Sequence, residues 1–345
     1  MKAKRLAGLV LAAALSLSAF TGCGIDASET VATLGEQEVT VGIANFMCKY
    51  QKAFMDDTYV SYYGSKVWDM DMSGSGVTLG ENLKESVMEY LHEMYVVKSH
   101  MEDYKVTLTD EENKAIADAV AAFMEANSAD TLKEMGATED TVKEMLELYT
   151  IQWKVYNEVI KETDREVSDE DANMRGISYI SIGTAGAYNS QGTYEAYTET
   201  KKAELKATAE KMQKDLETKS LEDVAKAYDY EVTEDAYAKD DEGFDATLLK
   251  AMDALKEGEV SKMIETKSAI YFVRIDEDTD KKATEENREA IIAERESELY
   301  AKVLEGWMKD DGWTVNEDVL EKIDFHHVLT QKDPNAKETE KATDK

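Results

Sequence analysis

Proline and cysteine are scarce in this sequence. The first scarcity excludes frequent helix breaks, and the second argues against an intramolecular disulfide. Pro334 is the only proline in 345 residues, so long helices can run without the break that an internal proline imposes. There are two cysteines, and if Cys23 is modified as argued below, Cys48 has no partner for an intramolecular disulfide. Cys48 lies among apolar residues, and we interpret it as a small buried apolar side chain rather than a redox centre.

Histidine is also rare, with four in the whole chain. No group of cysteines and histidines has the spacing of a metal site. The sequence therefore predicts no metal ion, and nothing in it implies a cofactor. Two of the histidines, His326 and His327, form a dipeptide near the C-terminus, and we expect them to be solvated.

Positive charge is the third shortage. The chain has 40 basic and 73 acidic residues, for a formal net charge of −33. Such a surface repels nucleic acid and anionic lipid headgroups. It favours solubility, and it favours basic or unfolded polypeptides as partners.

The first residues have the order of a secretory signal. Two lysines and an arginine occupy positions 2, 4 and 5, and an apolar run follows over residues 6–19. This run is too short for a stable membrane span, which needs about 20 residues. The sequence therefore predicts export, with residues 1–22 as the signal peptide.

The residues that end this signal resemble a lipobox, the site at which a bacterial cysteine receives diacylglycerol before cleavage. Thr21 and Gly22 directly precede Cys23. We therefore predict lipidation of Cys23, a short tether over 23–29, and a chain held at the outer face of the bacterial cytoplasmic membrane. Without its three basic residues the net charge becomes −36. The alternative is an ordinary signal peptide that happens to end near a cysteine.

The sequence pattern over residues 30–165 predicts a mainly helical domain. A strand and turn over 31–40 lead into a helix over 41–56, and an aromatic loop follows. Thr78 with Glu81, and Thr109 with Glu112, have the spacing of capping boxes that begin helices. Two apolar stripes at helical spacing predict buried helix faces, and they consist of Leu83, Val87, Leu91, Met94, Val97 and Met101, and of Val142, Met145, Tyr149, Trp153, Tyr156 and Ile160.

The order of strand-like and helix-like segments over residues 174–277 predicts a small α+β domain. Residues 177–182 alternate like a strand, and a loop rich in glycine, serine, asparagine and tyrosine follows over 183–194. A helix is expected near 196–217 and a last strand over 269–275.

The sequence after this domain predicts a long helix that packs back on the helical domain. A long helix begins at Thr284, with Leu299, Val303 and Trp307 on one apolar face. Because the small α+β domain has no need of this helix, we expect residues 284–325 to pack on the helical domain. The α+β domain is then an insertion. Residues 326–345 mix both charges and are predicted to be a disordered tail.

In this order the chain resembles extracytoplasmic foldases of the PrsA/SurA class, which carry a parvulin-type peptidyl-prolyl isomerase domain. The segments that carry the resemblance are 34–40, 83–95, 136–139, 177–182, 255–261 and 270–275. It implies an α+β fold class, in which a mainly helical SurA-N-like chaperone domain is completed by a C-terminal helix and interrupted by a parvulin-like insertion.

The resemblance also points to a site. Active parvulins have two histidines on neighbouring strands, and the matching positions here are Tyr179 and Tyr271. By strand alternation Tyr179 and Ser181 share a face, and if the strands pair as in the family, both tyrosines face one groove. Phe244 is expected to form an aromatic wall of this groove. The predicted peptide-binding residues are therefore Tyr179, Ser181, Phe244 and Tyr271.

Two interpretations of the tyrosines stay open. Each is an ordinary half-buried aromatic residue of a strand, or both line a peptide groove. Catalysis has less support, because a phenol with a pKa near 10 is a poor acid–base group at neutral pH. We assign no catalytic residue, and the sequence leaves open whether the chain is an enzyme.

These observations favour a lipid-anchored chaperone or foldase that binds unfolded exported polypeptides, with weak or absent isomerase activity. The 16 methionines and 18 tyrosines suit adaptable apolar binding. One alternative is an active parvulin-type isomerase. A second is a ligand-binding lipoprotein of an uptake system, although that class usually repeats strand–helix alternation with short parallel strands.

Overall fold

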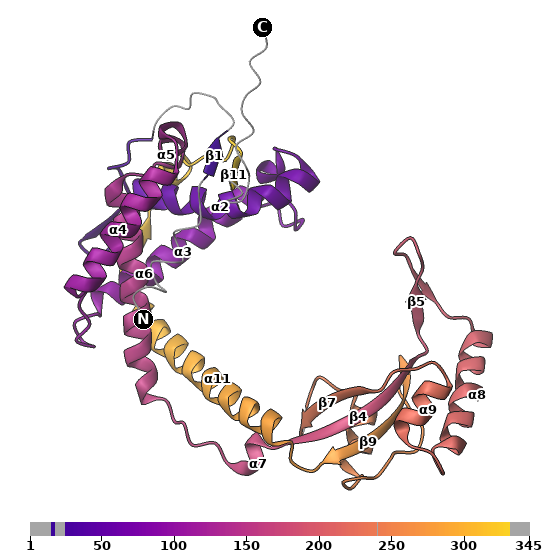
Figure 1. The fold of residues 1–345 in the computed structure, drawn as a ribbon. Coiled ribbons are helices and arrows are strands. Elements are labelled where there is room, and N and C mark those ends of the chain that lie inside the picture. Colours follow the sequence, from indigo (N-terminus) through magenta and orange to yellow (C-terminus); the bar gives the residue numbers. More distant parts are fainter. Residues whose placement is uncertain (1–14, 18–24, 240, 332–345) are drawn as a thin grey trace. The chain divides into compact units, whose positions relative to one another are not determined.

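The computed structural model describes residues 15–17, 25–239 and 241–331 of the chain. Cys23, most of the predicted signal and residues 332–345 of the predicted tail lie outside the described residues. The chain divides into two compact units (Figure 1), the first of Met1–Glu162 with Glu298–Lys345 and the second of Thr163–Ser297. No helix in the described part of the chain combines the length and the apolar character that a bilayer crossing requires.

The first unit is built from helices around a small sheet, and the long helix α11 begins in the second unit and ends in the first. Its described elements are β1 (Leu15–Leu17), β2 (Thr30–Leu34), β3 (Gln37–Thr40), α2 (Val41–Tyr63), η2 (Val67–Asp69), α3 (Leu79–Ser99), α4 (Asp110–Ala126), α5 (Ala129–Met135), α6 (Glu139–Val159), η3 (Ile160–Glu162), α11 (Lys281–Met308), β10 (Trp313–Val315), α12 (Glu317–Leu320) and β11 (Leu329–Gln331).

The second unit mixes short helices with an antiparallel sheet. Its described elements, apart from the first part of α11, are α7 (Asp169–Ala172), β4 (Met174–Gly183), β5 (Gly186–Tyr188), β6 (Tyr194–Ala196), α8 (Glu199–Asp215), α9 (Leu221–Ala227), β7 (Thr233–Ala238), α10 (Ala246–Asp253), β8 (Ile264–Glu265) and β9 (Ala269–Glu277).

The helix starts of the first unit are where the sequence predicts them. The Thr78 side chain accepts a hydrogen bond from the amide of Glu81, and the Glu81 carboxylate accepts one from the amide of Thr78. Thr109 and Glu112 begin α4 in the same way. Both capping boxes are confirmed, because this arrangement satisfies amide groups that a helix cannot pair internally.

Helix α2 is longer than predicted. It continues to Tyr63, whereas the sequence predicts an aromatic loop after residue 56. No proline or glycine interrupts the segment before Gly64, whose φ of 83° ends the helix. Its last turns carry exposed aromatic side chains, including Tyr62 at 79% exposure.

The C-terminal part of α11 packs on the helical unit. Leu304 is buried in a cluster that also contains Val97 of α3 and Val155 of α6. The Trp307 indole stacks on the His100 ring, with 4.5 Å between the ring centroids. The predicted fold class is confirmed: a mainly helical domain is completed by a C-terminal helix and interrupted by a small α+β unit.

The sheet of the second unit has the strand order β7-β4-β9-β8, with every neighbouring pair antiparallel. Ile180 of β4 lies opposite Phe272 of β9, and both are buried on the face that contacts α8 and α9. The opposite face carries Ile177 and Val273 and packs against α10. The predicted strands 177–182 and 269–275 therefore pair in the centre of one sheet.

The segment between β4 and α8 is a hairpin rather than the predicted loop. β5 and β6 pair so that Tyr188 lies opposite Tyr194, and their rings pack edge to face. Gly186 is required at its position, because a Cβ there would lie 2.3 Å from the carbonyl oxygen of Glu195 and 2.7 Å from the ring of Tyr194. The Asn189 side chain accepts hydrogen bonds from the amides of Gln191 and Thr193 and closes the turn.

Cys48 gives a testable consequence of this core. It is fully buried, and burial raises the pKa of its thiol from 9.0 to about 12. In a Cys23→Ser chain we expect no reaction of Cys48 with a thiol reagent at pH 8 until the protein unfolds. Above about pH 9 the unfolded chain loses the thiol proton while the folded chain keeps it, so the free energy of unfolding should fall between pH 9 and 12. Urea titrations of this chain and of the Cys48→Ala variant, compared at each pH, measure this fall. Rapid labelling of the folded chain would contradict the expected protection of Cys48.

Candidate functional site

The structure brings Tyr179 and Tyr271 together. Tyr179 on β4 lies opposite Val273, and Ser181 lies opposite Tyr271 on β9. The two tyrosines are therefore diagonal neighbours on one face of the sheet. Their ring centroids are 6.0 Å apart with an angle of 60° between the planes, and both side chains are half-buried.

The other two predicted residues lie on the same side of the sheet. Phe244 belongs to the apolar cluster that includes both tyrosines, and its ring packs edge to face on Tyr237 at 6.1 Å. Tyr237 is fully buried on β7. Ser181 is exposed, and by its pairing with Tyr271 it shares this face. The four side chains give the surface aromatic rings and three hydroxyl groups.

The electrostatics of this face oppose acid–base chemistry. Burial raises the pKa of the Tyr179 phenol above 10, the negative charge of Asp235 raises it further, and a hydrogen bond with Thr233 acts in the opposite direction. The Tyr179 hydroxyl is therefore neutral at pH 7. It can donate or accept a hydrogen bond, but it is a poor proton acceptor for catalysis. The segment 174–278 contains no histidine.

Arg175 positions this face, although the sequence patterns predict no role for it. Its guanidinium donates to the Tyr237 hydroxyl at 2.9 Å, to the backbone oxygen of Met252 at 3.1 Å and to that of Leu255 at 2.8 Å. It also pairs with the Asp278 carboxylate at 2.6 Å. One side chain thus joins β4, β7 and the end of α10 behind the aromatic cluster. The signal in the sequence was an arginine at the start of an apolar strand.

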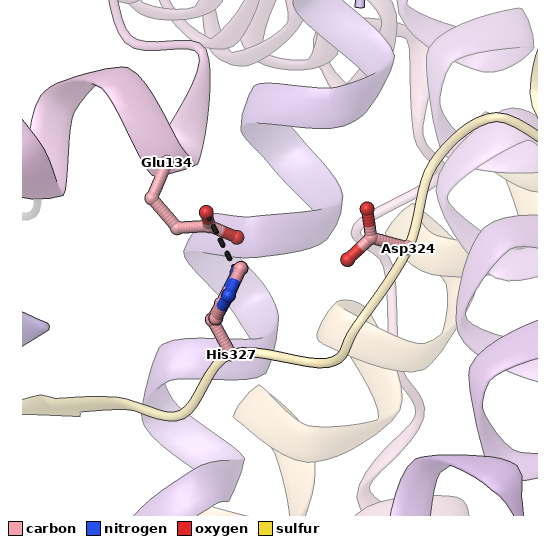
Figure 2. Close-up of side chains that lie close together, drawn as sticks. All are labelled: Glu134, Asp324 and His327. Carbon is pink, nitrogen blue, oxygen red and sulfur yellow. Dashed lines mark ion pairs between the residues drawn. The ribbon is translucent and has the colours of Figure 1, made fainter. Parts of the chain in front are cut away.

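A second group of titratable side chains lies in the first unit (Figure 2). Carboxylate oxygens of Glu134 and Asp324 and a ring nitrogen of His327 lie within 4.8 Å of one another. The buried ammonium group of Lys49 is 2.7 Å from Glu134 Oε1 and 3.6 Å from Asp324 Oδ1. Since a lysine already neutralises these carboxylates, we interpret the group as an ion-pair network and assign no metal to it.

The same group corrects the interpretation of His327 as a solvated residue. Its Nδ1 lies 2.9 Å from Glu134 Oε2, and the side chain is only 20% exposed. Residues 326–331, which the sequence predicts to belong to a disordered tail, return along α2 and end in β11. Contacts with residues about 190 to 275 positions away hold them there, and no local pattern encodes such contacts.

The chain is similar in sequence to known proteins. The family model of the PPIC-type PPIASE domain matches residues 188–306, a range that includes Tyr271 and begins after Tyr179. Foldase protein PrsA of Clostridium botulinum strain 657 / Type Ba4 is 30% identical over 256 residues, which cover 66% of this chain and 73% of that protein. The same foldase of strain Okra / Type B1 is 29% identical over 265 residues, with coverage of 70% and 76%.

Similar solved structures include foldase protein PrsA of Lactococcus lactis and the peptidylprolyl isomerase PrsA of Bacillus cereus. That of Lactococcus lactis has a TM-score of 0.34 at 14% identity and covers 86% of this chain and 98% of its own. That of Bacillus cereus has a TM-score of 0.33 at 19% identity and covers 74% and 95%. On the sequence relationship, the chain belongs to the PrsA family of foldases, which carry a parvulin-type peptidyl-prolyl isomerase domain.

Proposed function

We propose that this foldase is a lipid-anchored chaperone that binds unfolded exported polypeptides, and that its isomerase activity is weak or absent. The observation that carries the proposal is the pair of tyrosines, Tyr179 and Tyr271, at the two positions where the family resemblance expects histidines. We further propose that residues 1–22 are removed and that lipid on Cys23 holds the chain at the outer face of the cytoplasmic membrane.

The aromatic face supports binding more than catalysis. Rotation about a prolyl amide has a barrier of about 20 kcal/mol, and a catalyst must bind the twisted amide better than the planar one. Tyr179 and Tyr271 offer ring faces and hydroxyl groups to a peptide. The Tyr179 hydroxyl is neutral at pH 7, so this position supplies no charged group to favour the twisted state.

The first unit supports a role in holding apolar segments. Large apolar side chains are exposed on the second half of α2 and on the segment after it, namely Phe54, Met55, Tyr62, Tyr63, Met70 and Met72. Exposed methionine and aromatic side chains suit the binding of varied apolar sequences. We propose that residues 30–165 and 284–325 form the cradle that uses them.

The uptake-binder alternative has less support. All pairings in the four-stranded sheet and in the β10-β2-β3 sheet are antiparallel. The repeated parallel strand–helix units of a typical solute-binding protein do not occur in the described parts of the chain.

A proline-limited refolding assay separates a binder from a working isomerase. We expect the purified chain, at micromolar concentration, to leave the slow refolding rate of a proline-limited test protein nearly unchanged. The same chain should reduce aggregation of a chemically unfolded protein. An added cyclophilin gives the positive control for the refolding rate. Clear acceleration by the chain itself would show that the tyrosines support catalysis.

Binding at the aromatic face has its own test. In a Tyr179→Ser, Tyr271→Ser chain we expect affinity for a fluorescent proline-containing peptide to fall about tenfold, since two aromatic contacts are lost. Titration by fluorescence anisotropy measures the change. The matched control is Tyr188→Ser, which removes a tyrosine exposed on the β5–β6 hairpin. Equal loss in both variants would show that the face has no special role.

A further inference from the structure

A buried ion pair in the first unit holds the backbone of β11. Lys52 and Asp56, one turn apart on α2, are both almost completely buried and paired with each other. Asp56 accepts a hydrogen bond from Trp68 Nε1 at 2.8 Å and one from the backbone amide of Leu329 at 2.8 Å. Burial of a charged pair is costly compared with apolar packing. What this pair provides, and apolar side chains would not, is a fixed hydrogen bond to the first residue of β11.

Other charged side chains fasten the segment that leads into β11. Lys52 also donates to the backbone oxygen of His327 at 2.8 Å. The ring of His327 lies against the carboxylate of Glu134 on α5 (Figure 2), and Asp324 lies near the ammonium group of Lys49. β11 is therefore held beside α2 by contacts that do not involve the strand with which it pairs.

That partner strand is β1, from the predicted signal peptide. β1 pairs antiparallel with β11, with Leu15 opposite Gln331 and Leu17 opposite Leu329. It also contacts α5. Cleavage before Cys23 removes β1, while the residues that fasten β11 to α2 remain in the chain. The cleaved chain then has a positioned strand whose outer edge is unpaired.

We propose that this edge of β11 binds an extended apolar segment of an exported polypeptide by strand addition, and that the chain's own signal segment occupies it before cleavage. The inference rests on the proposed function and on signal removal. β1 shows the kind of occupant: an extended backbone from an uncharged apolar run, preceded by basic residues. Recognition through backbone hydrogen bonds is tolerant of sequence, and the acidic surface of the chain favours basic flanks.

The test uses the cleaved form, residues 23–345 with Cys23→Ser, and the full chain of 345 residues. The probe is a fluorescent peptide of residues 11–20 with two added N-terminal lysines. We expect saturable binding to the cleaved form by anisotropy, and binding about tenfold weaker to the full chain, whose own β1 competes for the edge.

Two proline substitutions test strand pairing from either side. Thr330→Pro in the cleaved form, and Ser16→Pro in the peptide, are each expected to weaken binding about tenfold, because proline lacks the amide hydrogen of a paired strand. Circular dichroism checks that Thr330→Pro folds, and the peptide variant needs no such check. Tyr188→Ser in the cleaved form, which changes an exposed residue of the β5–β6 hairpin, is the control and should bind the peptide normally.

The outcomes separate this inference from the proposed function. Equal binding to the full and cleaved chains, insensitivity to both prolines, or no saturable binding would each overturn the β11 site. If the cleaved chain still suppresses aggregation in that case, the chaperone proposal stands without it. Loss of aggregation suppression together with intact peptide binding would instead overturn the chaperone proposal.

Discussion

Replacement of Asp56 by leucine is expected to lower the free energy of unfolding of the helical unit by about 3–5 kcal/mol. The change leaves the Trp68 indole and the backbone amide of Leu329 without their acceptor, and it leaves the buried Lys52 ammonium with the backbone oxygen of His327 but no carboxylate partner. An unpaired buried charge is among the costliest defects in a core. Urea unfolding followed by tryptophan fluorescence measures the loss.

Related variants separate the charge from the hydrogen bonds. Lys52→Met is expected to cost less than Asp56→Leu, because Asp56 keeps the two donors from Trp68 and Leu329. The double variant should recover part of the loss, since it removes both charges. The exposed pair Lys114 and Asp118 is the control, and its removal should leave stability nearly unchanged. Equal effects at the buried and exposed pairs would contradict the buried network.

Phe272→Ala is expected to lower the free energy of unfolding of the α+β unit by about 3–5 kcal/mol. Phe272 is fully buried at the centre of β9, opposite Ile180, in a cluster completed by Met212 of α8 and Leu221 of α9. Removal of the ring leaves a cavity between the sheet and two helices. Both the lost burial and the cavity contribute to the cost.

Scanning calorimetry shows which unit responds. The cluster around Phe272 lies within Thr163–Ser297. The unfolding transition of the second unit should therefore move to lower temperature, while the transition temperature of the first unit stays the same. Ile182→Val in the same cluster is the matched conservative change and should cost about 0.5–1.5 kcal/mol. A shift of both units by the same amount would show that they unfold as one cooperative unit.

The sequence predicted features that depend on neighbouring residues. Thr78 and Glu81 begin α3 as expected, because the hydrogen bonds of a capping box join residues three apart. Residues 177–182 form part of β4, since alternation of apolar and polar side chains reports the two faces of a strand. The end of α2 was placed too early and the β5–β6 hairpin was missed. In both cases aromatic and glycine-rich composition was interpreted as a loop, although Gly64 ends a helix and Gly186 fits beneath a tyrosine ring.

The sequence alone determined the family, the helical and α+β character of the two parts, and the candidate pair Tyr179 and Tyr271. Only the tertiary structure decided that these rings lie 6.0 Å apart, that Arg175 binds the hydroxyl of Tyr237, and that Lys52 and Asp56 hold a strand more than 270 residues away. The physical reason is the range of the interactions. Caps and strand alternation act over a few residues, whereas a groove and a buried ion pair arise only when distant segments pack together.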